Sequence, residues 1–154
     1  MPWAEVKPAY DPAVRKICWR EYAGHPKGCP NHGNRRDCPP MAPLLPDILD
    51  LDRPVYVIWN CFDFGKHRAR MQERHPKWSE RQLRCCLYWQ GTARKQLRGQ
   101  VQIFMFQHKD LHIIMTPEAM GVNITATMKR LGITLEWPPE TITYQVALGG
   151  HRKK

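Results

Sequence analysis

The chain has 154 residues, enough for one domain, and its 24 Lys and Arg against 14 Asp and Glu give a net charge of +10. An apolar fraction of 42% is typical of a globular protein, and no apolar run reaches the ~20 residues that a membrane helix needs. The first residues lack a basic segment followed by an apolar one, so we expect no signal peptide, a cytoplasmic location and no membrane partner. The one serine, Ser79, is expected to cap a helix, which excludes an ordinary serine hydrolase.

The first predicted element is a short helix over residues 11–22, where Asp11 fits the N-cap and Pro12 the first helical position. The residues that share its predicted buried face are Ala13, Val14, Ile17 and Cys18. Residues 23–46 then lack apolar periodicity, and Gly, Pro and basic residues dominate them. Loops longer than about 12–15 residues are uncommon unless they are functional or tied down, so we expect something other than an apolar core to fix this one.

A buried strand is predicted over residues 54–60, which are β-branched and aromatic. Asp63 is placed to cap a basic helix that Pro76 ends, and further strands are predicted over residues 111–115 and 141–147. Asn123 is expected to cap a helix that continues to Leu131.

A long helix is predicted over residues 80–107. Ser79 and Gln82 form a capping box, and Trp78 and Leu83 a hydrophobic staple. The residues of its predicted core stripe are Leu83, Cys86, Leu87, Gln90, Arg94, Leu97, Val101 and Phe104.

Strands that alternate with helices predict an α/β fold, a small single domain over residues 1–154 with a few-stranded sheet packed by helices. Residues 54–148 would form the packed core, and residues 149–154 a loose basic tail. Residues 11–53, which hold half of the prolines, would be a Cys/Pro-rich region shaped by a metal.

Six cysteines are many for an intracellular protein of this size, and in a reducing compartment they favour metal ligands or reactive thiols over disulfides. Cys18, Cys29 and Cys38 flank and punctuate the loop, and a proline follows each of the last two. Thiolates are soft ligands that suit zinc, copper(I) and iron–sulfur clusters. Because the sequence shows nothing else that would hold this loop in place, these three cysteines are the predicted metal ligands.

The fourth ligand is open. Cys85 and Cys86 are neighbours on one helix and diverge by about 100°, so at most one of them is expected to reach the metal. Cys61 is the other candidate, and for all three the alternative is a small buried apolar residue. His25 and His32 lie in the loop and could complete a zinc site.

Two blocks of the chain resemble a family of small metal-binding proteins of unknown function. The first block is Cys18-Trp-Arg-Glu-Tyr22, followed by Cys29-Pro and Cys38-Pro-Pro-Met-Ala-Pro. The second block, residues 117–124 running into residues 129–132, resembles a Glu-Ala-x-Gly segment that precedes a helix in that family. The resemblance implies a bound metal, plausibly an iron–sulfur cluster, and makes Glu118 a weak acid–base candidate.

The family pattern is incomplete here. Many members carry further cysteines before the second block, whereas residues 111–116 have none, which argues against a second cluster. If three cysteines hold one [4Fe–4S] cluster, an iron remains open for sulfur transfer or Lewis-acid chemistry. A fourth cysteine would instead favour electron transfer with a redox partner protein.

Basic residues are concentrated between residues 64 and 98, with ten Lys and Arg against two acids. Besides Lys66, the residues of this basic belt are Arg68, Arg70, Arg74, Lys77, Arg81, Arg84, Arg94, Lys95 and Arg98. Trp78, Tyr88 and Trp89 are interleaved, and this mixture of cations and rings fits nucleic acid as well as a merely solvated helix pair. Arg84 and Arg94 flank Cys85 and could hold an anionic substrate beside the metal.

Two functions from different classes follow. The first is a [4Fe–4S] protein with redox, sulfur-transfer or Lewis-acid chemistry on an anionic or nucleic-acid substrate. The second is a zinc-stabilised basic module that binds nucleic acid without catalysis.

Overall fold

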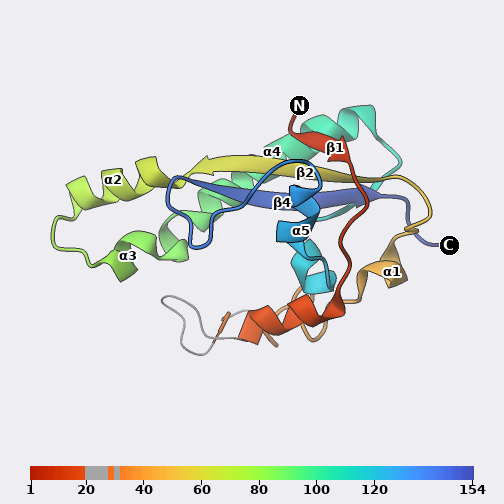
Figure 1. Ribbon diagram of the computed structural model, residues 1–154, viewed down its shortest axis with the longest axis horizontal. Helices are drawn as coiled ribbons and strands as arrows, with labels where there is room; N and C mark the ends of the chain where they lie inside the picture. The colour runs from red at the N-terminus through yellow and green to blue at the C-terminus, as the bar shows by residue number, and fades with distance from the viewer. Residues whose placement is uncertain (20–27, 30–31) are drawn as a thin grey trace.

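The computed structural model describes residues 1–19, 28–29 and 32–154 (Figure 1). A four-stranded antiparallel sheet in the order β1-β2-β4-β3 runs through its centre. The strands are β1 (Trp3–Glu5), β2 (Val55–Asp63), β3 (His112–Ile114) and β4 (Ile142–Gly150). The α/β class and the three predicted strands are confirmed. We did not expect β1, because three residues are too few to show an alternating pattern.

The helices largely begin where the capping residues predicted. The described helices are η1 (Pro12–Trp19), α1 (Leu45–Ile48), α2 (Phe64–Arg74), α3 (Glu80–Arg84), η2 (Cys86–Tyr88), α4 (Gln90–Gln107), η3 (Pro117–Met120) and α5 (Ile124–Lys129). The Asp63 side chain accepts the Lys66 N–H, and the Asn123 side chain accepts the Ala126 N–H. Within the described ranges, no helix has both the length and the apolar character that crossing a membrane requires.

Helices cover both faces of the sheet (Figure 1). On β2, Ile58 faces α4, whereas Val57 faces the opposite layer formed by α1, η3 and α5. Leu45 and Leu49 of the proline-rich region enter this second layer and are almost fully buried. The core therefore begins before residue 54 and includes part of the proline-rich region.

The predicted helix over residues 80–107 is wrong as one element. It breaks into α3, η2 and α4, because Cys85 has an extended backbone and Trp89 is not helical. The Trp89 ring is buried against Phe62 and Phe64, and its Nε1 donates to the Arg84 carbonyl at 3.4 Å. Tertiary packing thus overrides helical periodicity here, and Leu87 of the predicted core stripe is 79% exposed.

The predicted loose tail is also wrong in part. Gly149 and Gly150 belong to β4, and Lys153 N donates to Ile48 O at 2.8 Å. A Cβ on Gly149 would lie 2.8 Å from a ring carbon of Phe104, and one on Gly150 would lie 2.9 Å from a Leu49 methyl carbon. The two glycines are needed because α4 and the α1 region approach the strand closely there.

The buried face that we predicted for residues 11–22 is wrong where the side chains are described. Ala13 is exposed and Ile17 is 61% exposed, whereas Val14 and Arg15 are half-buried. The segment is a 3-10 helix, in which three residues make a turn, so the faces differ from those of an α-helix. Residues 20–22 of the predicted helix lie outside the described residues.

Candidate metal centre

The segment that carries Cys38 is fixed by hydrogen bonds to η1. Arg15 Nη2 donates to Pro40 O at 3.1 Å and to Ala42 O at 2.9 Å. Ala42 N in turn donates to Cys38 O at 3.0 Å. The loop therefore has protein contacts of its own, which the sequence did not reveal.

The start of η3 holds the same segment from the other side. Thr116 Oγ1 donates to Asp37 O at 3.0 Å, and η1 packs along η3. The helix that contains Cys18, the segment that contains Cys38 and the helix that contains Glu118 are thereby neighbours. Only the backbone of Cys18 is described, so its side chain is not placed.

Cys29 lies within electrostatic reach of both Cys38 and Cys86. Burial raises the pKa of the Cys38 thiol, and the nearby Asp37 and Cys29 raise it further. Burial also raises the pKa of Cys86, with Cys85 and Cys29 adding to the effect. All of these cysteines are half-buried. The fold thus brings Cys86 within electrostatic reach of Cys29, although the two positions differ by 57 in the sequence.

The charge of Arg94 acts on two of these thiols. Its positive charge lowers the pKa of Cys38 and Cys86, against the stronger effect of burial on each. It also acts on Glu118, whose pKa is raised by desolvation from the surrounding chain. The Glu118 residue is nevertheless exposed to solvent. Its location near Arg94 is therefore more relevant to the candidate site than its raised pKa. The region can therefore offer thiolates, one guanidinium and one carboxyl to a ligand.

Cys86 is positioned by the break that ends α3. Trp89 stacks on Phe62 with ring centroids 5.4 Å apart and meets the Phe64 ring edge-on at 5.6 Å. Cys86 packs against this aromatic cluster. In a continuous helix, the side chains of residues 85–89 would not have the orientations that they have here. The break between α3 and α4 therefore contradicts the predicted helix and also sets the orientation of Cys86.

Cys61 does not belong to the group, and the expectation that it is buried is wrong. It is exposed and lies opposite Tyr144 in the β2–β4 pair. Alternation along β2 turns it away from Phe62, which packs in the cluster beside Cys86. Cys61 is therefore not a candidate for the fourth ligand.

The remaining predicted ligands are only partly placed. His32 N donates to Cys29 O at 3.1 Å, and His25 lies outside the described residues. Within the described part of the chain, no three His, Cys, Asp or Glu side chains are arranged to hold a metal ion. The side chain of Cys18 lies outside this described part.

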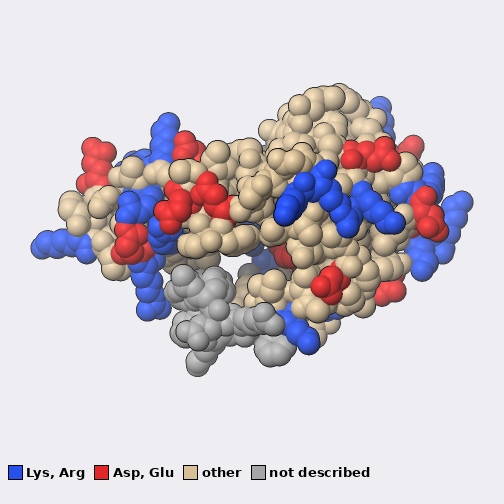
Figure 2. Space-filling view, in the orientation of Figure 1, with Lys and Arg blue, Asp and Glu red and all other residues tan. Residues whose placement is uncertain are grey.

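The basic belt is divided by the fold. Arg84 donates to Pro139 O at 2.8 Å and to both carboxylate oxygens of Glu140 at 3.0 Å. Glu80 accepts hydrogen bonds from Arg84 and from Arg68. Figure 2 shows acidic side chains between the basic ones at the left end of the molecule, where α2 and α3 lie. The Arg84 side chain is therefore paired within the chain, whereas the charge of Arg94 acts on Cys38, Cys86 and Glu118.

The turn that presents Glu140 to Arg84 is organised by Glu136. The Thr141 hydroxyl, the Thr141 N–H and the Glu140 N–H all donate to its carboxylate and lower its pKa to about 2. Since the folded pKa lies below the ordinary value of 4.5, these bonds stabilise the fold above that value and are lost as pH falls toward 2.

We expect Glu136→Gln to abolish this contribution. The difference in unfolding free energy between wild type and variant should be constant above pH about 5 and shrink as the pH falls from there toward 2. Urea titrations at several pH values measure it. The control is Glu73→Gln, at an exposed position of α2. An equal pH dependence for both variants would contradict the assignment.

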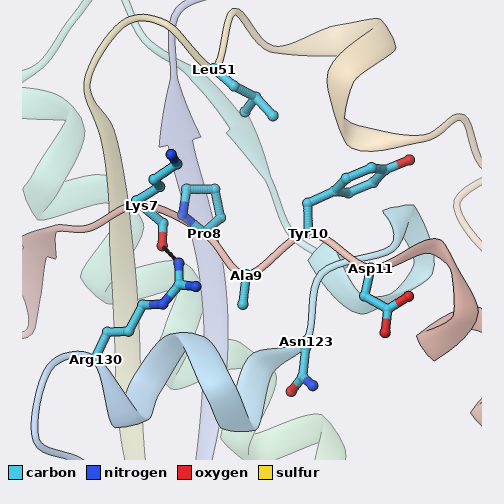
Figure 3. Close-up of a pocket in the computed structure, with 8 residues that line it drawn as sticks. All are labelled: Lys7, Pro8, Ala9, Tyr10, Asp11, Leu51, Asn123 and Arg130. Carbon is cyan, nitrogen blue, oxygen red and sulfur yellow. Dashed lines mark hydrogen bonds between the residues drawn. The ribbon is translucent and has the colours of Figure 1, made fainter.

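A pocket of about 370 Å³ lies elsewhere, between the segment after β1 and α5 (Figure 3). Lys7, Pro8 and Leu51 are among its lining residues, and the Arg130 guanidinium donates to Lys7 O. The Asn123 side chain is already used as the helix cap. No cysteine or histidine lines it, so this pocket is separate from the thiols.

No protein-family model, curated protein or solved structure matches the chain. The resemblance to a metal-binding family therefore stays a prediction that rests on the two sequence blocks.

Proposed function

We propose that this protein holds a cysteine-ligated [4Fe–4S] cluster, with Cys18, Cys29 and Cys38 as ligands and Cys86 as the fourth. The supporting observation is that the charge of Cys29 acts on both Cys38 and Cys86, although Cys86 is far from Cys29 in sequence. The backbone of Cys18 belongs to η1, which is hydrogen-bonded to the Cys38 segment.

The donor set fits such a group chemically. Half-buried thiols are soft ligands that suit iron–sulfur clusters and zinc, and a nearby cation offsets the negative charge of several thiolates. When bound, the cluster supplies one-electron transfer or, with an open iron, Lewis-acid chemistry. Arg94 would hold an anionic group beside the thiols, and the Glu118 carboxyl would take up or release a proton.

Cys86 decides between two modes of action. A fourth thiolate closes the site, which favours electron transfer with a partner protein. A dispensable fourth thiol leaves a place where an anionic substrate held by Arg94 meets the metal. Cys85 is the internal alternative, because it adjoins Cys86 and is likewise half-buried.

The test is anaerobic purification followed by iron, sulfide and zinc analysis and an absorption spectrum. We expect about four irons and four sulfides per chain and a brown protein. Cys29→Ser and Cys38→Ser should lose most of the iron, whereas Cys61→Ser, at an exposed thiol on the other face of β2, should retain it.

Colourless protein with one zinc per chain would overturn the cluster and leave the zinc-stabilised alternative. Equal iron loss in all three variants would show that the thiols are not specific ligands. Cys85→Ala and Cys86→Ala, analysed in parallel, identify the fourth ligand, and full iron content in both would favour the open site.

A further inference from the structure

Three aromatic rings, two of them exposed and the middle one half-buried, are stacked at the end of the molecule formed by α2, α3 and η2. The rings of His75 and Trp78 are stacked, with centroids 4.0 Å apart and planes 7° apart. Tyr88 contacts the Trp78 ring at 4.8 Å. We call His75, Trp78 and Tyr88 the ring ladder.

The backbone fixes the three rings from two segments, the turn after α2 and the element η2. His75 N donates to Met71 O and Trp78 N to His75 O, which fixes the turn after α2 at the spacing that superimposes the two rings. Tyr88 reaches them from η2, the element created by the break after α3. His75 is the member that our sequence interpretation missed, although a histidine three residues before Trp78 was a signal.

The ladder is outside the core. His75 is exposed and Tyr88 is 50% exposed, whereas the adjacent Trp89 is buried at 9% exposure. The break therefore turns Trp89 inward and Tyr88 outward. Large rings stacked on one another at a surface are unusual for side chains without a partner, and they favour a flat ligand.

Exposed cations lie beside the ladder, among the acidic side chains of α2 and α3. Arg74 and Lys77 are exposed and directly precede His75 and Trp78 in sequence. Arg81, the second residue of α3, is exposed as well. In Figure 2, basic side chains project from this end of the molecule. Flat rings together with cations complement a ligand that combines planar groups with phosphates.

We propose that the ring ladder binds single-stranded nucleic acid, with unpaired bases stacked on the exposed rings and phosphates beside Arg74 and Lys77. Bases in a duplex already stack on each other, so their faces are unavailable to rings at a protein surface. An acidic peptide would satisfy the cations but not the stacked rings. The proposal does not depend on a metal at the cysteines.

The test is fluorescence anisotropy with labelled single strands about 16 nucleotides long, one RNA and one DNA, and with the matching duplex. Both single strands should bind more tightly than the duplex, and the RNA and DNA arms identify the preferred sugar. Tyr88→Ala should weaken single-strand binding about tenfold, since base–ring stacking is lost. Leu87→Ala, at the neighbouring residue with 79% exposure and no ring, should leave it unchanged.

A second pair of variants tests the phosphate contacts. Lys77→Gln should reduce the slope of log affinity against log salt by about 0.7, whereas Lys109→Gln, exposed beyond α4, should not. Trp78→Phe, which keeps a ring, should bind better than Trp78→Ala. Circular dichroism and urea unfolding of each variant separate lost binding from lost folding.

Equal affinities of wild type and folded Tyr88→Ala, or equal binding of single strand, duplex and heparin, would overturn the proposal. Cys29→Ser is expected to bind single strands like the wild type. Failure of the metal centre and failure of the ring ladder are therefore distinguishable.

Discussion

Phe104→Ala is expected to lower the free energy of unfolding by about 3–5 kcal/mol. The Phe104 ring is completely buried and lies where three elements meet. It contacts Trp3 of β1 at 5.7 Å and Tyr56 of β2 at 5.5 Å between ring centroids. Gly149 of β4 has no side chain, and the Phe104 ring occupies the space where one would lie. The truncation therefore leaves a cavity that the neighbouring residues do not fill without moving.

Urea titration followed by far-ultraviolet circular dichroism measures this loss. Phe106→Ala is the matched control, because Phe106 is on the same helix and is 82% exposed. Its effect should stay within about 0.5 kcal/mol. A loss below 1 kcal/mol for Phe104→Ala would mean that the ring does not join the three strands as described.

Trp89→Ala is the second change with a large expected effect, again about 3–5 kcal/mol. Trp89 fills the cluster between Phe62 and Phe64, and its Nε1 satisfies the carbonyl of Arg84 at the end of α3. Without the ring, the break between α3 and α4 loses its anchor. Because Cys86 packs on the same cluster, its thiol should become more exposed.

Two measurements check this prediction. Urea unfolding gives the stability, and the rate of reaction with a thiol reagent reports the exposure of Cys86 in a background where the other five cysteines are replaced by alanine. Trp137→Ala is the control, since Trp137 is 74% exposed and far from the cluster in sequence. Unchanged thiol reactivity in the Trp89 variant would separate Cys86 from the ring cluster.

Local signals were sufficient for much of the secondary structure. The caps at Asp63, Ser79 and Asn123 begin helices because a side-chain oxygen accepts a backbone N–H within a few residues. The β-branched run that became β2 was equally clear. Such interactions involve neighbours in sequence, so the sequence contains them directly.

The errors arose where distant parts of the chain compete with local preference. Nothing in residues 80–107 indicates that Phe62 and Phe64 will draw Trp89 inward and break the helix. Gly149 and Gly150 suggest a loose end until Phe104 and Leu49 are seen against them. In each case a side chain far away in sequence supplies the deciding contact.

The candidate site divides in the same way. The sequence by itself determined that Cys18, Cys29 and Cys38 lie in a proline-rich region with a soft-ligand chemistry, and that cations gather around residues 64–98. Only the tertiary structure decided that the charges of Cys29 and Arg94 act on Cys86, that Cys61 is exposed, and that Arg84 is held by Glu140. Side-chain chemistry is a property of each residue, whereas proximity depends on packing among all of them, and packing is what brings the thiols and the rings to their places.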